Sequence, residues 1–159
     1  MKPYVCIVII LLSFSVYSQK CDDTPDLNEK IIKSAEKQLS KKVGRGECWD
    51  LAEFVLNEHD ADWDGYEKYG RLIDHDSECL YPGDIIQFEK IKIQYKEGHL
   101  TYTENMYHHT AIIKEVVNEI EVVILHQNTE KFGRKVGSSS LKFDTIVSGD
   151  LLIYRPKEN

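Results

Sequence analysis

The chain has 159 residues, 42% of them hydrophobic, and this length predicts one globular domain with its own core. It carries 20 Lys and Arg against 27 Asp and Glu, a net charge of −7, so we expect an acidic surface. Such a surface repels nucleic acid and anionic lipid, and the sequence has a single tight basic group, Lys41, Lys42 and Arg45. The composition therefore disfavours nucleic-acid binding as a function.

The first eighteen residues, 1–18, have the pattern of a secretory signal peptide. Lys2 supplies a positive charge, residues 5–14 are almost wholly apolar, and polar residues follow. The apolar run is shorter than the roughly 20 residues that a membrane span needs, so a lasting anchor is the less favoured interpretation. We expect cleavage near Ser18 or Gln19 and a secreted, extracellular or periplasmic protein with a single domain over residues 19–159.

The cysteines predict one disulfide and one free thiol. Cys6 would leave with the signal peptide, and Cys21, Cys48 and Cys79 would stay. In an oxidising compartment two of these are expected to pair, and the third is a candidate reactive thiol. Cys21 and Cys79 lie in polar, loop-like stretches, whereas Cys48 does not. We predict a Cys21–Cys79 disulfide and a free Cys48.

Two helices are predicted in the first part of the mature chain. Thr24 and Pro25 form a helix start, and apolar residues then recur at helical spacing, which predicts a helix over about 25–41. A glycine-containing turn follows at residues 43–46. The pattern then predicts a second helix over 48–58, with Cys48 in its first turn.

Beyond the acidic and irregular stretch 59–80, the apolar period changes to two residues, which is typical of β-strands. The segments predicted as strands are 84–89, 90–95, 110–117, 119–128 and 150–154. Helices followed by strands indicate an α+β fold. We expect the N-terminal helices to pack on a mostly antiparallel sheet of five to six strands.

Cys48 is the candidate nucleophile. The thiolate is the reactive form of cysteine, and a helix N-terminus lowers the pKa of a thiol. The basic residues of segment 41–45 would act in the same direction, while Gly44 and Gly46 would leave the approach to the sulfur open. The amides of the first turn could serve as an oxyanion hole. The alternative is that Cys48 is a small buried residue that stabilises helix packing.

A cysteine nucleophile needs an imidazole base, and the base needs a third group that holds its tautomer. His108 and His109 are adjacent in a predicted strand, so only one of them can face the helix that bears Cys48. A hairpin near residue 118 would bring His126, in the next strand, close to His109. A pair of strand histidines is also consistent with a purely structural role.

Four segments, in this order along the chain, resemble a known superfamily: Gly-Glu-Cys-Trp-Asp-Leu-Ala-Glu at 46–53, Tyr-Pro-Gly-Asp-Ile-Ile-Gln-Phe at 81–88, His-His-Thr-Ala-Ile-Ile at 108–113 and Ile-Leu-His-Gln-Asn at 124–128. They look like the NlpC-like and CHAP-like cysteine peptidases and amidases. These families share a reduced papain-like fold, in which the nucleophile opens a helix packed on an antiparallel sheet. The resemblance spans residues 44–154.

The resemblance implies a catalytic triad of Cys48, His109 and His126. His109 matches the base of those families because Thr110, Ala111 and Ile112 follow it at the family spacing. The third polar position falls on His126. Two features depart from the NlpC pattern, namely the histidine doublet and the Cys48-Trp49 pair.

Four further residues receive weaker roles from the same resemblance. Asn128 and His108 are possible additional polar residues of the site. Gly46 and Trp49 would lie in the substrate groove or at the oxyanion hole.

Two metal sites compete with this interpretation. Asp60, Asp62, Asp64 and Gly65 match the opening of a calcium loop, but Arg71 stands at the twelfth position, where a glutamate is needed. Zinc could be held by Cys48 and the five histidines at 75, 99, 108, 109 and 126, but no paired ligand spacing occurs. We expect no metal and no cofactor.

The sequence thus predicts a secreted, monomeric thiol hydrolase that cleaves an amide or peptide bond. Cell-wall peptidoglycan is one candidate substrate, and the acidic charge weakly favours cationic or neutral substrates. The competing hypothesis is a papain-like secreted binding module without turnover, since a fold does not fix a function.

Overall fold

The structure is a computed structural model that describes residue 21 and residues 23–159. The predicted signal peptide and Cys6 lie outside these residues. Two α-helices, α1 (Asp26–Glu36) and α2 (Asp50–Glu58), precede the strands. The strands are β1 (Arg71–Ile73), β2 (Ile85–Glu97), β3 (Leu100–Asn118), β4 (Glu121–His126), β5 (Gly137–Lys142) and β6 (Ile146–Arg155), with a short 3-10 helix, η1 (Phe143–Thr145), before β6.

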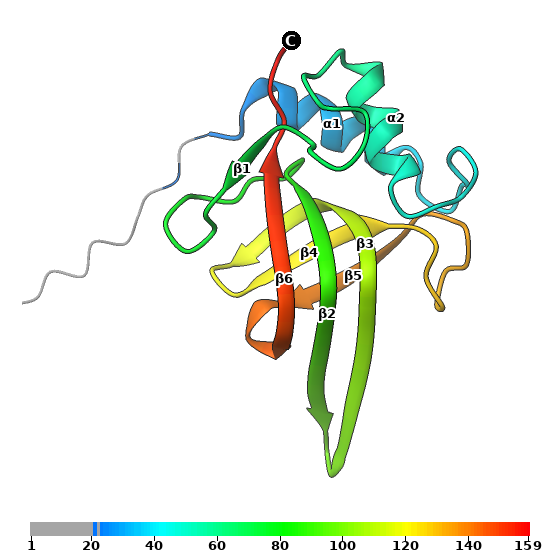
Figure 1. The fold of residues 1–159 in the computed structure, drawn as a ribbon, viewed down its shortest axis with the longest axis vertical. Helices are drawn as coiled ribbons and strands as arrows, with labels where there is room; N and C mark the ends of the chain where they lie inside the picture. Colours follow the sequence, from blue (N-terminus) through cyan, green and yellow to red (C-terminus); the bar gives the residue numbers. More distant parts are fainter. Residues whose placement is uncertain (1–20, 22) are drawn as a thin grey trace, which may run out of the picture.

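The strands form one sheet in the order β1-β6-β2-β3-β4-β5, and each neighbouring pair is antiparallel. This confirms the α+β class and the expected antiparallel sheet. Both helices lie at the end of the sheet where β6 finishes (Figure 1). From there β2 and β3 run away from the helices as a long hairpin, so the helices cover only one end of the sheet.

The first core cluster lies between the helices and the sheet. Apolar residues recur every three or four positions in each helix, so they share one face. These faces pack on side chains of β2, β3 and β4 that point to the same side of the sheet, called here the helix face. The main members are Leu27, Ile31, Ala35, Leu51, Val55, Ile85, Ile112 and Leu125.

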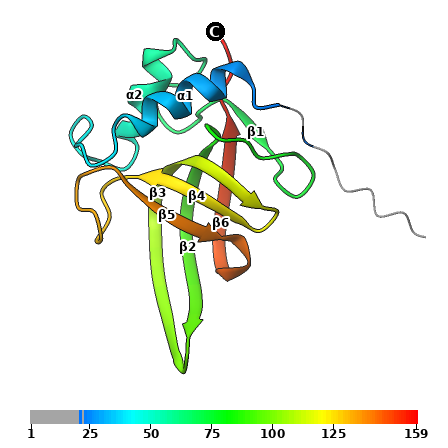
Figure 2. The same ribbon diagram turned by 180° about the vertical axis from the view of Figure 1, so that it is seen from behind.

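The second core cluster lies on the opposite side of the sheet, called here the inner face. In both views β4 and β5 cross over β2 and β6, so the sheet curls on itself (Figures 1 and 2). Because successive strand residues point to opposite sides, neighbours such as Ile85 and Ile86 belong to different clusters. The inner face holds Ile86, Phe88, Ala111, Ile113, Ile124, Leu141 and Ile153.

A tight turn before β2 contacts both the first helix and the end of the last strand. Gly83 has φ +89°, and a Cβ at this position would collide with the backbone carbonyl of Asn28 in α1. The next residue, Asp84, is buried and accepts hydrogen bonds from the side chains of Asn28 (2.8 Å) and Arg155 (2.8 and 3.1 Å). One carboxylate therefore links α1, the start of β2 and the end of β6.

Several predicted boundaries differ from the structure. The first helix ends at Glu36 instead of continuing to 41, because the chain turns and Leu39 forms a parallel β-bridge with Val136. The segments 84–89 and 90–95 are one strand, irregular near Lys90, whose φ is +52°. β3 begins ten residues before the predicted position 110. The short strands β1 and β5 were not predicted.

A disulfide joins Cys21 to Cys79, as predicted, and Cys48 is a free cysteine. The bond links the segment before α1 to the loop before β2. Among the helices of the described residues, none is long and apolar enough to cross a membrane.

Candidate active site

Cys48 lies in the loop between the helices, two residues before the first residue of α2. It is half-buried, and its thiol donates a long hydrogen bond to the backbone carbonyl of His108 (Sγ···O 4.0 Å). Thr110 also contributes backbone and side-chain hydrogen bonds to the sulfur. The structure therefore brings the free cysteine to the helix face of β3, at the histidine doublet.

The pKa of the Cys48 thiol is raised above its ordinary value, whereas the sequence predicted that it would be lowered. Burial removes water from the thiolate and outweighs the hydrogen bonds from Thr110 and Trp49, which favour the charged form. The sequence also predicted that Arg45 would lower this pKa. Its guanidinium instead pairs with Asp50 (3.2 Å) and lies 5.2 Å from the ring centre of Trp49. Burial thus favours the neutral thiol over the thiolate.

The loop that carries Cys48 is fastened to the sheet by Gln127, which directly follows β4. This side chain is fully buried. Its amide oxygen accepts the N–H of Val43 (3.2 Å), and its amide nitrogen donates to the carbonyls of Val43 (3.1 Å) and Glu47 (2.7 Å). Asp50 holds the other side of the loop by accepting the N–H of Glu47 (3.0 Å). These contacts fix the backbone immediately before the sulfur.

The two glycines of the loop serve packing rather than access to the sulfur. Gly44 and Gly46 have φ of +54° and +87°. A Cβ at Gly46 would press on the side chain of Arg134, and one at Gly44 would press on Asp50. Neither glycine is among the residues that line the cavity at Cys48, so the predicted role of Gly46 in the groove is not supported by this geometry.

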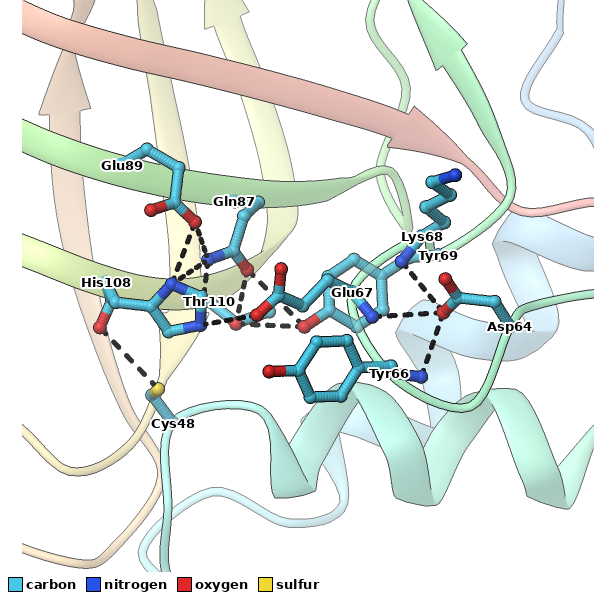
Figure 3. A network of polar contacts seen from close by, with 10 residues as sticks. All are labelled: Cys48, Asp64, Tyr66, Glu67, Lys68, Tyr69, Gln87, Glu89, His108 and Thr110. Atoms are coloured by element: carbon cyan, nitrogen blue, oxygen red, sulfur yellow. Dashed lines mark hydrogen bonds and ion pairs between the residues drawn. The ribbon is translucent and has the colours of Figure 1, made fainter.

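His108 lies on the helix face and is held by a carboxylate. Its Nδ1 is 2.8 Å from Oε1 of Glu89, its partner across the β2–β3 pair, and Glu89 also accepts a hydrogen bond from Gln87 (2.8 Å). A carboxylate this close to Nδ1 favours the tautomer that carries its proton there. Nε2 is 3.5 Å from Oε1 of Glu67 (Figure 3).

A buried polar network supports this arrangement. The hydroxyl of Thr110 donates to the amide oxygen of Gln87 (2.8 Å), and the hydroxyl of Tyr69 lies 3.2 Å from that of Thr110. Burial raises the pKa of Tyr69 to about 12, so this hydroxyl keeps its proton. Gln87, Thr110 and Tyr69 together hold the sheet surface beneath Cys48 in one arrangement (Figure 3).

A cavity of about 390 Å³ opens at this point. It is lined by Glu47, Cys48, Trp49, Tyr66, Glu67, Tyr69, His108 and Asn128. The thiol and the imidazole of the helix face thus open onto the same space. Trp49 and Asn128, both predicted site residues, also line it, and Asn128 donates a hydrogen bond to the carboxylate of Glu47 (3.0 Å).

His109 and His126 lie on the inner face of the sheet, away from Cys48. As the hairpin predicted, the two meet, with His109 Nε2 3.1 Å from His126 Nδ1. His109 also packs on Phe88 of the inner cluster, and His126 Nε2 is 3.0 Å from the hydroxyl of Ser139. The structure does not bring His109 to the sulfur, because strand alternation turns His108 and His109 to opposite sides.

Burial also sets the charge of this inner pair. The pKa of His109 is lowered to about 4 by burial and by the nearby His126 and His108. The pKa of His126 is likewise lowered to about 4 by burial and by Lys131. Both imidazoles are therefore neutral at physiological pH, and each finds a hydrogen-bond partner within the sheet.

The comparisons with known proteins agree with this architecture. A family model described as the AIM3/BBC1 cysteine proteinase-fold domain matches residues 25–159. The chain belongs to this family. Its papain-like cysteine-proteinase fold is thus shown, whereas membership of the NlpC-like or CHAP-like families stays a prediction.

Two solved structures resemble this AIM3/BBC1-family domain, both at 16% identity. One is the crystal structure of Ly7917, with a TM-score of 0.47 over 80% of this chain and 62% of that one. The other is Ly7917 with the hydrolyzing product of MDP, with a TM-score of 0.49 over 81% and 63%. The domain therefore spans less than two thirds of the length of these structures. A search of curated proteins gave no match.

The acidic loop of the AIM3/BBC1-family domain engages its carboxylates internally. Asp62 pairs with Lys157 (2.7 Å), and one oxygen of Asp64 accepts the N–H groups of Tyr66 (2.8 Å), Glu67 (3.0 Å) and Lys68 (3.0 Å). These contacts use both carboxylates within the chain. Within residues 21 and 23–159, no group of three or more His, Cys, Asp or Glu is placed to hold a metal ion.

Sequence reasoning missed the residues that surround His108 and Cys48. Glu89 and Gln87 alternate with apolar Ile86 and Phe88 in β2, so a polar pair on one side of a buried strand was a usable signal. Gln127 gave no comparable signal, because its partners are backbone groups 80 and 84 residues away in the chain.

Proposed function

We propose that this domain is a thiol hydrolase of amide or peptide bonds, in which Cys48 is the nucleophile and His108 is the general base. The observation that carries the proposal is the shared cavity: the free thiol and an imidazole held by a carboxylate line the same space. These are the parts that cysteine hydrolases use. His108 takes the role that the sequence assigned to His109, and Glu89 takes that of His126.

The proposed reaction begins with proton transfer from the thiol of Cys48 to Nε2 of His108. The sulfur attacks the carbonyl carbon of the substrate, and the amide N–H groups of Cys48 and Trp49, which lie beside the sulfur, stabilise the oxyanion. The imidazolium then gives its proton to the leaving amine, and a thioester remains on Cys48. Water, deprotonated by His108, attacks this thioester and releases the carboxylic acid and the thiol.

Glu89 acts through His108 and is a positioning residue. By accepting the Nδ1 proton it keeps Nε2 available as the base, and its negative charge stabilises the imidazolium that forms in the first step. Because the resting thiol is neutral, this base-assisted step, rather than a preformed ion pair, generates the nucleophile.

The proposed setting is extracellular or periplasmic. The signal-peptide pattern of residues 1–18 and the Cys21–Cys79 disulfide both support secretion. We further propose that the domain acts as a monomer without a cofactor, on a peptide or on cell-wall peptidoglycan. Incubation of the purified protein with peptidoglycan and with a peptide library, followed by mass spectrometry, tests this. New products are expected from the wild type and none from Cys48→Ala; identical product sets from both would overturn it.

A second candidate, a papain-like binding module without turnover, is favoured by one observation. The raised pKa of the Cys48 thiol is typical of an unreactive buried cysteine. Iodoacetamide distinguishes the two functions: a cysteine assisted by His108 is alkylated quickly near neutral pH, and an unassisted one is not. A slow reaction that is unchanged in His108→Gln would support the binding module.

A further inference from the structure

The cavity at Cys48 is lined by aromatic rings and carboxylates, and none of its described lining residues is Lys or Arg. Trp49, Tyr66 and Tyr69 supply the rings, and Glu47 and Glu67 supply the charge. Rings and carboxylates both attract cations, and together they form the usual environment of an ammonium group. The residues that line the cavity therefore indicate a positively charged ligand.

The two carboxylates differ in how far their charge is already compensated. Glu47 lies 3.3 Å from the guanidinium of Arg134 and accepts a hydrogen bond from Asn128. The ionisable partner of Glu67, within the described residues, is the imidazole of His108 at 3.5 Å. Glu67 has no Lys or Arg partner among the ion pairs of the described residues, and it lines the cavity.

The loop that presents Glu67 is ordered before any ligand arrives. One oxygen of Asp64 accepts the backbone N–H groups of Tyr66, Glu67 and Lys68 and so fixes the turn. Figure 3 shows the side chains of Tyr66 and Glu67 reaching from this turn toward Cys48 and His108. Tyr66 is 66% exposed, so its ring is accessible to a ligand.

We propose that this cavity takes a substrate with a positively charged group next to the reacting amide, and that Glu67 and the ring of Tyr66 hold that group. The chemical class is a primary ammonium, as on a basic side chain or a peptide N-terminus. That the ligand is a substrate rests on the proposed function. The preference of the cavity for a cation does not, and it can be measured separately. Glu67 is thus a specificity-determining residue.

Two thiol reagents of opposite charge test the preference without any need for hydrolysis. Aminoethyl methanethiosulfonate is a cation and sulfonatoethyl methanethiosulfonate an anion; each forms a mixed disulfide with a thiolate and releases methanesulfinate. The ratio of their rates at Cys48 is compared with the ratio for free N-acetylcysteinamide, with Cys48→Ala as the blank. We expect the protein to favour the cation by about tenfold more than the free thiol does.

Variants decide whether Glu67 causes the preference. Glu67→Gln should bring the ratio close to that of the free thiol, while Glu119→Gln, an exposed glutamate of the β3–β4 turn, should leave it unchanged. A wild-type ratio equal to that of the free thiol would overturn the inference. So would a Glu67→Gln variant that slows both reagents equally, because Glu67 would then act on the thiol and not on the ligand.

A substrate experiment completes the test. Peptides that the wild type cleaves are compared with the same peptides after acetylation of their amines, which removes the positive charge. Acetylation should lower kcat/KM by about tenfold for the wild type and much less for Glu67→Gln. If no amide is cleaved while the reagent preference persists, the proposed function fails and the cation preference stands as a binding property.

Discussion

The helix face and the inner face of the sheet hold the same polar residue type in opposite environments. His108 is half-exposed, lies between the carboxylates of Glu89 and Glu67, and opens onto the cavity at Cys48. His109, the next residue, is 8% exposed, and its pKa is lowered to about 4. One step along a strand therefore separates a histidine that shares a cavity with the free thiol from one that is buried in the inner face.

The surroundings of each histidine follow from the residue that lies opposite it on the neighbouring strand. Glu89 is the partner of His108 on β2, whereas Phe88 is the partner of His109. A carboxylate supports proton transfer, and a phenyl ring supports only packing. Substitutions at His108 and at His109 should therefore have different effects.

The largest effect is expected in hydrolysis. Cys48→Ala and His108→Ala should each lower kcat/KM on any cleaved amide by about a thousandfold or more, because each removes an atom that makes or breaks a bond. His109→Gln should retain activity within a few-fold of the wild type below its melting temperature. Steady-state kinetics on one substrate, with circular dichroism as the folding control, measures this. A thousandfold loss in His109→Gln with an intact fold would reverse the assignment.

The inner pair should instead control stability in acid. Its pKa values, about 4 when folded, lie below the unfolded value of about 6.5, so the unfolded chain binds more protons between these pH values. The stability that the neutral pair contributes is present above pH 6.5 and is lost as the pH falls toward 4, on the order of 3 kcal/mol for each histidine.

Urea unfolding at several pH values measures this loss. His126→Gln should flatten the pH dependence because it removes one titrating group. His99→Gln, at an exposed position in the β2–β3 turn, is the control and should leave it unchanged. An equally steep loss in His126→Gln would show that other groups cause the acid instability.

Gln127 connects the Cys48 loop to the inner pair of histidines, because it fastens that loop to the end of the strand that carries His126. Gln127→Ala removes three hydrogen bonds and leaves buried backbone groups unpaired, so it should cost about 2 kcal/mol of unfolding free energy. Asn128→Ala, which loses one exposed bond to Glu47, should cost less than about 1 kcal/mol. Equal losses in both variants would argue against the clamp.

A smaller effect is expected from the residue that orients His108. Glu89→Gln keeps the size of the side chain but removes its charge, so the preferred tautomer and the stabilisation of the imidazolium are weakened. We expect kcat to fall by about tenfold with little change in KM, and the pH profile to shift. A change in KM alone would indicate that Glu89 contacts substrate instead.

Much of the fold could be predicted because its signals are local. The helical spacing in α1 and α2, the period of two in β2, β3, β4 and β6, and the loop character around Cys21 and Cys79 all lie within short windows. The strands that were missed lack such signals: β1 has three residues, and β5 begins Gly-Ser-Ser-Ser, without β-branched side chains.

The site was predictable only in part. Cys48 stood out because it was the cysteine left over from the expected disulfide. Strand alternation showed that His108 and His109 must point to opposite sides. Which side faces the helices depends on how the sheet curls and on which face α2 covers, and no local pattern contains that information. Family spacing selected His109, whereas in the structure His108 shares the cavity with Cys48. The raised pKa of Cys48 likewise results from burial by residues distant in the chain.

In the proposed mechanism, His108 activates Cys48 from the helix face. The most direct test is the rate of alkylation of Cys48 by iodoacetamide between pH 5 and 9 in the wild type, His108→Gln and His109→Gln, with Cys48→Ala as the blank. We expect a rate near pH 7 that falls at least about tenfold in His108→Gln and is unchanged in His109→Gln. A rate that is unchanged in His108→Gln, or lost only in His109→Gln, would contradict it.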